Sequence, residues 1–164
     1  NAASHCAAVR APFASSSLQG QVWVANFIFT RCPYPLFCPL TTGNLADTQR
    51  RLTAMTNGPT NWQILAISID PDYDTPAVLH EYGKRFSYDS KTWSFLTGDL
   101  VETTAIAEQF GLTFWHKDGQ QLPDHNLRTV VVDASGKIQS IVPGNKWTVD
   151  ELVTGIVKAA AAKP

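Results

Sequence analysis

Long apolar runs are missing from this chain of 164 residues. A helix that crosses a bilayer needs roughly 20 consecutive apolar residues. The longest apolar run here, VWVANFIF at residues 22–29, is far shorter and contains Asn26. The sequence therefore predicts no membrane-spanning helix in this part of the chain, and the run suits a buried strand.

Excess charge of one sign is also absent. The chain has 13 basic and 14 acidic residues, which gives a formal net charge of -1. Proteins that attract nucleic acid or anionic lipid usually carry a clustered positive excess. We therefore expect no nucleic acid among the partners of this protein.

Cysteine is scarce, with three residues in the whole chain. An iron–sulfur cluster is usually held by four cysteine thiolates, so the chain is one short of that set. With 44% hydrophobic residues, a domain of this length can bury a sizeable core without disulfide bonds. An odd count leaves at least one thiol outside any internal pair, and we expect Cys6 to be that free thiol.

Buried strands alternate with helices along the rest of the chain. Hydrophobic patterns predict strands at 22–29, 62–69 and 93–96, and a hairpin formed by 127–132 and 137–142. Helices are expected from Cys38 to Asn57, from Pro76 to Phe86, from Asp99 to Gly111 and from Thr148 onward. This alternation predicts an α/β fold in which a central mixed β-sheet is flanked by helices on both faces.

The chain shows no internal repeat and no linker, so we expect one domain spanning residues 1–164. Residues 1–20 are rich in Ala and Ser and have no clear hydrophobic period. We therefore expect them to form an irregular lead-in to the first buried strand.

Two of the cysteines, Cys32 and Cys38, lie in the stretch FTRCPYPLFCP directly after the first strand. A disulfide bond across so short a loop would stabilise the fold by roughly 2 kcal/mol or less. In open α/β folds the carboxyl ends of strands are where ligands bind. The helix expected to begin at Cys38, with Pro39 in its first turn, and the neighbouring Arg31 both favour thiolates. The position thus favours a redox pair or a metal site over a purely structural bridge.

A metal site would require a further ligand, and the chain has four histidines, His5, His80, His116 and His125. His5 belongs to the lead-in, His80 is expected on a helix surface, and His116 lies in the polar loop FWHKDGQQ. His125 directly precedes a predicted strand, where histidines are more often satisfied loop residues than ligands. The residues alone leave both the redox and the metal interpretation open.

The chemistry of these side chains limits which metal ions could bind. Thiolates are soft ligands that suit copper(I) and zinc, and imidazole suits copper and zinc. A closed zinc site needs four protein ligands, whereas three can satisfy copper(I).

Four segments taken together resemble the Sco (SenC) family in their order and spacing. They are FIFTRCP…FCPLTT, SIDPDYDTPAVLHEYGKRF, WSFLTGD and DHNLRTVVVDASGKI, and the ending GNKWTVDELV is similar as well. The resemblance runs from Gln21 to the C-terminus. One departure concerns the cysteine motif, because the family usually has three residues between its cysteines and this chain has five, Pro33 to Phe37.

The resemblance implies a thioredoxin-like fold and a copper site formed by Cys32, Cys38 and His125. Zinc would fit the same place if Asp70 or His116 completed the set as a fourth ligand. Asp70, in the SIDP segment, would lie near this site as an outer-sphere or docking group. The two cysteines would also be redox-active, so that oxidation to a disulfide would discharge the metal.

The same resemblance implies a metallochaperone rather than an enzyme. Such a protein carries copper(I) or copper(II), and it delivers or prepares copper for the binuclear site of cytochrome c oxidase subunit II or another copper-accepting protein. A thiol reductant would be a second partner. The family also implies an extracytoplasmic location, periplasmic or on the cell-envelope side, with a membrane anchor in the full-length protein.

A thiol-disulfide oxidoreductase of the thioredoxin type, with Cys32 and Cys38 as its catalytic pair and no stable metal, is the alternative. Such enzymes usually have two residues between their cysteines and a cis-proline near the position of His125, for which Pro123 is the candidate. A third class, an interaction domain without chemistry, would tolerate the loss of Cys32. The apolar residues Tyr34, Leu36 and Phe37 between the cysteines would either form a docking surface or pack against the loop that contains Trp115.

Overall fold

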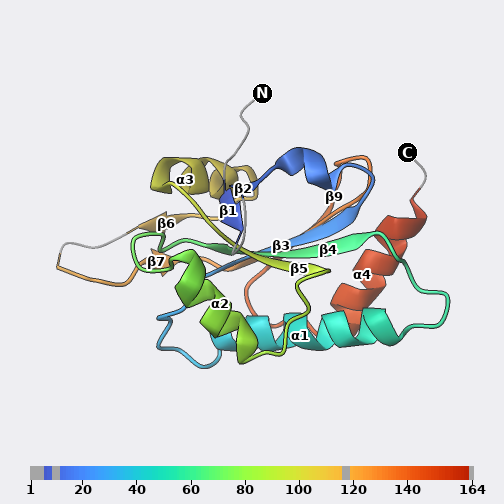
Figure 1. The fold of residues 1–164 in the computed structure, drawn as a ribbon, viewed down its shortest axis with the longest axis horizontal. Coiled ribbons are helices and arrows are strands. Elements are labelled where there is room, and N and C mark those ends of the chain that lie inside the picture. Colours follow the sequence, from blue (N-terminus) through green and yellow to red (C-terminus); the bar gives the residue numbers. More distant parts are fainter. Residues whose placement is uncertain (1–5, 9–11, 116–118, 163–164) are drawn as a thin grey trace.

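The structure is a computed structural model that describes residues 6–8, 12–115 and 119–162. The strands are β1 (Cys6–Ala8), β2 (Pro12–Phe13), β3 (Val22–Ile28), β4 (Trp62–Ser68), β5 (Trp93–Thr97), β6 (Phe114–Trp115), β7 (Asp124–His125), β8 (Arg128–Val132) and β9 (Ile138–Pro143). The helices are the 3-10 helix η1 (Ser15–Leu18), α1 (Cys38–Ala54), α2 (Pro76–Lys84), α3 (Leu100–Gln109) and α4 (Val149–Ala161). Figure 1 shows their arrangement around one central sheet.

The central sheet has seven strands in the order β2-β1-β5-β4-β3-β8-β9. Strands β3, β4 and β5 run parallel to one another, and β8 and β9 continue the sheet in antiparallel fashion. Along β3 and β4 nearly every side chain is buried, which is expected where helices cover both faces of a sheet. The predicted mixed sheet is therefore confirmed.

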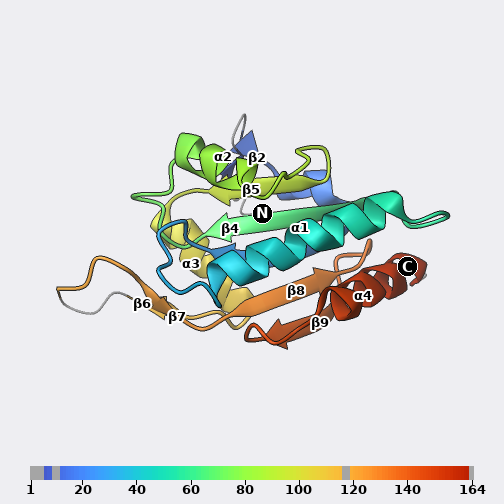
Figure 2. The same cartoon turned by 90° about the horizontal axis from the view of Figure 1, so that it is seen from below.

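Helices cover both faces of this sheet, as the sequence predicts. Figures 1 and 2 show α1, α2 and α4 on one face and α3, together with η1, on the other. A buried hydrogen bond between the hydroxyls of Thr42 in α1 and Tyr82 in α2, 3.1 Å long, joins two helices of the first face. Among the described residues, no helix has both the length and the apolar content required to cross a membrane.

The helix starts follow from local sequence signals. Thr148 and Glu151 form a reciprocal capping box at the start of α4, and the Asp99 carboxylate accepts from the Val101 amide at the start of α3. At α1, Cys38 is the first helical residue and Pro39 lies in the first turn, where its missing N–H costs nothing. These predicted boundaries are confirmed.

The prediction of an irregular lead-in over residues 1–20 is wrong for the part that the structure describes. β1 pairs antiparallel with β2 and with β5, so these residues extend the sheet beyond β5. The backbone groups at the edge of β5 need partners, and a short strand supplies them. Strands of two and three residues are too short to show a hydrophobic period, which is why the sequence pattern missed them.

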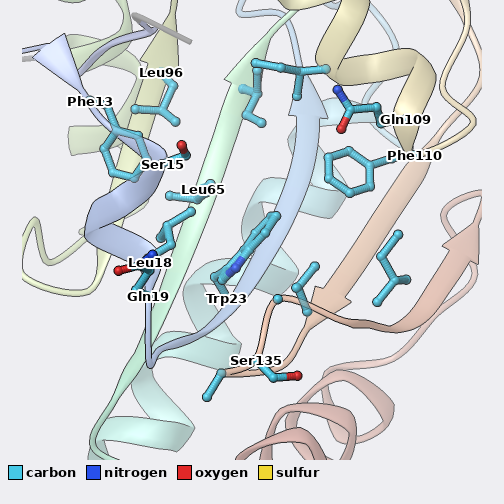
Figure 3. Close-up of a pocket in the computed structure, with 16 residues that line it drawn as sticks. Phe13, Ser15, Leu18, Gln19, Trp23, Leu65, Leu96, Gln109, Phe110 and Ser135 are labelled. Carbon is cyan, nitrogen blue, oxygen red and sulfur yellow. The ribbon is translucent and has the colours of Figure 1, made fainter. Parts of the chain in front are cut away.

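The face that carries α3 contains a cavity of about 820 Å³ between η1, the end of α3 and the turn after β8. Trp23, Leu65 and Leu96 form its floor, while Phe110 and Ser135 stand at its walls (Figure 3). Within the described part of the chain, the residues that line it include no cysteine and no histidine. This cavity is therefore separate from the cysteine loop.

Candidate metal and redox site

The cysteine loop connects the carboxyl end of β3 to the start of α1, at the edge of the sheet where parallel strands end. Cys32 is half-buried in this loop, whereas Cys38, as the first residue of α1, is fully buried. The two sulfurs are not bonded to each other in this structure. The two side chains are close enough to share a hydrogen bond, in which Cys38 is the donor when Cys32 is ionised. The Cys32 sulfur also lies 3.8 Å from the Tyr34 carbonyl oxygen.

The surroundings drive the acidity of the two thiols in opposite directions. The hydrogen bond from Cys38, helped by backbone groups of Tyr34 and Cys38, lowers the pKa of Cys32 to about 6. The same hydrogen bond, together with burial, raises the pKa of Cys38 well above its ordinary value. Cys32 is therefore the more acidic thiol of the pair, which makes it the better nucleophile.

His125 is carried by a separate two-stranded ribbon. β7 pairs antiparallel with β6, with His125 opposite Phe114, and neither strand belongs to the central sheet. The Asn126 side chain attaches this ribbon to the end of α3. Its amide oxygen accepts from the Thr113 N–H and its amide nitrogen donates to the Gly111 carbonyl oxygen, both at 3.1 Å.

The His125 ring is held in one tautomer. Its Nδ1 lies 2.6 Å from the carbonyl oxygen of Asn126, and because a carbonyl can only accept, Nδ1 carries the proton. The lone pair is therefore on Nε2. Burial lowers the pKa of His125, so that the ring is neutral at pH 7. A neutral imidazole with its second nitrogen fixed by a backbone carbonyl is the usual form of a metal-ligating histidine.

Phe29 is the shared neighbour of the cysteines and His125. Its ring packs edge-on against the His125 ring, with 5.5 Å between the centroids, and its backbone makes a hydrogen bond with the sulfur of Cys38. Nevertheless, no group of three or more His, Cys, Asp or Glu side chains within the described residues is placed to hold a metal ion. The structure thus brings Cys32 and Cys38 together and places His125 against an adjacent residue. The three-ligand set stays a prediction.

Asp70 is buried and paired. Its Oδ2 accepts two hydrogen bonds from Arg31, one from Nε at 2.9 Å and one from Nη2 at 2.7 Å. Only 4% of the residue is exposed. A buried carboxylate in an ion pair is poorly accessible to a docking protein. The expected place of Asp70 beside a copper site stays a prediction.

Asp74, two residues before the start of α2, is completely buried. It accepts hydrogen bonds from the Thr30 N–H at 3.1 Å, from the Thr30 hydroxyl and from the Ser68 hydroxyl at 2.6 Å. Burial raises the pKa of this carboxyl group above its ordinary value. Because Thr30 lies two residues before Cys32, Asp74 fixes the backbone at the start of the cysteine loop. Nothing in the local sequence distinguishes it from the exposed Asp72.

The remaining candidates lie elsewhere. The ring Nδ1 of His80 pairs with the Tyr88 hydroxyl at 3.0 Å, which leaves His80 in a structural role on α2. His5 and His116 lie outside the described residues. The peptide bond before Pro123 is trans, as are the other described peptide bonds.

The apolar side chains between the cysteines are exposed. Tyr34 is 60% and Leu36 68% exposed, and the ring of Tyr34 packs against that of Phe37 with centroids 5.3 Å apart. Trp115, on the His125 ribbon, is also exposed. Apolar side chains therefore lie open to solvent on both segments that carry candidate ligands.

Comparisons with known proteins agree with these observations. The SCO1/SenC family model matches residues 8–161. The SCO1 protein homolog of Bacillus subtilis is 28% identical over 151 residues, which are 90% of this chain and 75% of the relative. The SCO2-like protein of Rickettsia felis is 28% identical over 130 residues, but the match spans only 60% of that relative's length.

Solved structures are similar over nearly the whole chain. A SCO1/SenC family lipoprotein from Bacillus anthracis superposes with a TM-score of 0.80 at 28% identity, covering 92% of this chain and 88% of the other. BsSco, described as having a disulfide switch and as a member of the Sco family of cytochrome c oxidase assembly proteins, gives 0.79 at 28% identity, covering 96% and 91%. Yeast Sco1 with copper bound gives 0.80 at 25% identity, covering 98% and 88%. The fold is that of these proteins.

Proposed function

Since the chain belongs to the SCO1/SenC family, we propose that it is a metallochaperone that binds one copper ion through Cys32, Cys38 and His125. The observation that carries this proposal is the placement of two unbonded thiols, one half-buried and one buried, beside Phe29, against whose ring the His125 imidazole packs. The copper-bound structure of yeast Sco1 supports the choice of metal.

The donor set suits copper as a cargo. Two soft sulfur ligands and one imidazole satisfy copper(I), and copper(II) can be held when a further oxygen ligand joins. Cys38 must lose its proton when it binds the metal, so binding releases protons and weakens as the pH falls. His125 must also come closer to the sulfurs than it lies here, because the three groups do not share one ligand sphere.

Copper titration of the reduced protein tests the proposal. We expect one copper per chain in a Cys6→Ser background, which leaves only the loop thiols. Loss of outer-sphere partners typically weakens metal binding about 10- to 100-fold, so His125→Ala, which removes a ligand, should weaken it by at least that factor. His80→Ala is the matched control, because His80 lies on α2 and hydrogen bonds to Tyr88. Equal affinities in wild type and His125→Ala would refute the ligand assignment.

Delivery to the binuclear copper site of cytochrome c oxidase subunit II is the proposed task. Its support is the description of BsSco as a cytochrome c oxidase assembly protein, and another copper-accepting protein remains the alternative acceptor. The exposed Tyr34, Leu36 and Phe37 would form the docking surface beside Cys32. The test is copper transfer to the isolated copper domain of subunit II: a Leu36→Asp variant should retain copper affinity and lose transfer rate.

An extracytoplasmic location with a membrane anchor is part of the proposal. The lipoprotein description of the Bacillus anthracis relative supports it. Fractionation of cells that express the full-length protein tests it, and recovery in the soluble cytoplasmic fraction would contradict it.

Thiol–disulfide exchange is the second candidate function, because the two thiols differ in acidity in the way that such chemistry requires. The Cys32 thiolate would attack a disulfide of the partner protein, forming a mixed disulfide and releasing one partner thiolate. Cys38, after losing its proton, would attack the Cys32 sulfur, so that the Cys32–Cys38 disulfide forms and the partner leaves as a dithiol. The disulfide switch described for BsSco supports this role.

A trapping experiment separates the two candidate functions. Cys38→Ser should accumulate the mixed disulfide with a disulfide-containing partner, whereas Cys32→Ser should not react. If exchange is fast and His125→Ala binds copper as tightly as wild type, the oxidoreductase function is the correct one. If neither copper binding nor exchange responds to Cys32→Ser, the protein is an interaction domain instead.

A further inference from the structure

Arg31 links three segments that meet beside the cysteines. Its guanidinium group donates from Nε and Nη2 to Asp70 Oδ2, and Nη2 also donates to the Gln121 carbonyl oxygen at 3.3 Å. The centre of the guanidinium group lies 4.2 Å from the centroid of the Tyr73 ring. Arg31 directly precedes Cys32, and Gln121 lies four residues before His125.

These contacts hold the guanidinium group in one orientation. The Arg31 side chain is only 27% exposed and the Asp70 side chain 5%, so water competes less with the ion pair than at an open surface. Stacking on Tyr73 fixes the plane of the guanidinium group, which leaves Nη2 directed at the Gln121 carbonyl. A lysine has no planar fork and could not make the same set of contacts.

The His125 ribbon contacts the rest of the fold at several points. On its far side the Asn126 side chain binds Gly111 and Thr113, next to the end of α3. Towards the cysteines, the contacts include the packing of the His125 ring on Phe29 and the hydrogen bond from Arg31 to Gln121. Arg31 is thus a direct polar link between the cysteine loop and the chain that leads into His125.

We infer that Arg31 is a positioning residue that ties the His125-bearing segment to the cysteine loop, with Asp70 as its anchor. It keeps His125 within reach of Cys32 and Cys38 and so sets the strength of the three-ligand site. The effect of Arg31 on the strength of copper binding rests on the proposed copper function. The tie between Arg31 and the His125-bearing segment is present without metal, so it can be tested in the metal-free protein.

The metal-free protein gives the first test. The ring of Phe29 lies edge-on to His125, so its ring current shifts the His125 ring protons away from their values in a free imidazole. We expect Arg31→Gln to move these resonances toward the free values and to speed hydrogen exchange of the Thr113 and Asn126 amides. Arg51→Gln, which removes an exposed ion pair between α1 and Asp150, is the matched control and should change neither. Unchanged His125 resonances in Arg31→Gln would overturn the inference.

A double-mutant cycle gives the second test. Arg31→Gln should weaken copper binding by about tenfold, as loss of an outer-sphere partner does. In the His125→Ala background the same change should have little effect, because a residue that acts through His125 has nothing left to position. An equal loss in both backgrounds would show that Arg31 acts directly on the cysteines and would overturn the inference.

The two tests also separate failure of this inference from failure of the proposed function. If the wild-type protein binds no copper, the metallochaperone proposal fails. The His125 resonances of the metal-free protein then still decide whether Arg31 holds the segment.

Discussion

Cys32 and Cys38 share one hydrogen bond, and the difference between them comes from where the fold places each sulfur. The hydrogen bond with Cys32 and the complete burial of Cys38 make its charged form costly, so its pKa is raised. Cys32 lies in the loop and receives hydrogen bonds, which stabilise its thiolate. Cys32 is therefore the reactive thiol that solvent can reach, and Cys38 is the buried thiol whose hydrogen bond stabilises the ionised form of Cys32.

The acidity of Cys32 can be measured from the pH dependence of its alkylation. In a Cys6→Ser background the rate should rise to a plateau with a midpoint near pH 6, because the reactive thiolate is already formed there. Cys38→Ala removes the hydrogen-bond donor and should move the midpoint up toward 9.0, the ordinary thiol value. Cys38→Ser retains a hydroxyl donor and should move it less. A wild-type midpoint near 9 would contradict this description of the site.

Asp74 is the residue on which the loop backbone depends. Asp74→Ala leaves the amide and hydroxyl of Thr30 and the hydroxyl of Ser68 without their shared acceptor. We expect the free energy of unfolding to fall by about 3 kcal/mol, measured by urea denaturation, since buried donors without partners cost roughly 1–3 kcal/mol each. Asp72→Ala, at an exposed position nearby, is the control and should change it little.

The raised pKa of Asp74 also predicts the direction in which the stability of the protein changes with pH. Between the ordinary value of 3.8 and the raised folded value, the folded state binds more protons than the unfolded state. This group therefore makes the protein less stable as the pH rises through that window. Asp74→Asn lacks the ionisation, so the stability of wild type relative to this variant should fall with rising pH. A difference that does not depend on pH would mean that Asp74 titrates normally.

Among the elements, those with strong local signals match the sequence predictions and the short ones do not. The buried strands β3 and β4 and the caps at Asp99 and Thr148 follow from apolar runs and hydrogen-bonding side chains that a few residues determine. The two-residue strands β6 and β7 have no such signal, because their pairing depends on contacts between distant segments. The ribbon that carries His125 was accordingly predicted as a loop.

The capping box of α4 provides a test at this scale. Thr148→Ala removes the hydroxyl that accepts from the Glu151 amide, and we expect a loss of about 1 kcal/mol in the free energy of unfolding. Thr154→Ala, at an exposed position within the same helix, should be neutral or slightly stabilising because alanine has the higher helix propensity. A loss at Thr154 as large as that at Thr148 would show that the cap is not the cause.

For the molecule as a whole, the site is assembled from segments far apart in the chain. The sequence was sufficient to predict the mixed sheet, the place of Cys32 and Cys38 after the first buried strand, and the family. It could not predict that Asp70 is paired with Arg31, or that Arg31 also reaches the segment before His125. Those contacts depend on which loops meet at the sheet edge, and no local pattern encodes that.

The central claim is that sulfur and imidazole ligands from these distant segments bind the same copper ion. X-ray absorption at the copper edge, on protein loaded with one equivalent of copper, tests it most directly because it counts ligand types. The account predicts two sulfur ligands and one imidazole nitrogen in the wild type, and loss of the imidazole scattering in His125→Ala. An identical copper spectrum for wild type and His125→Ala would contradict it.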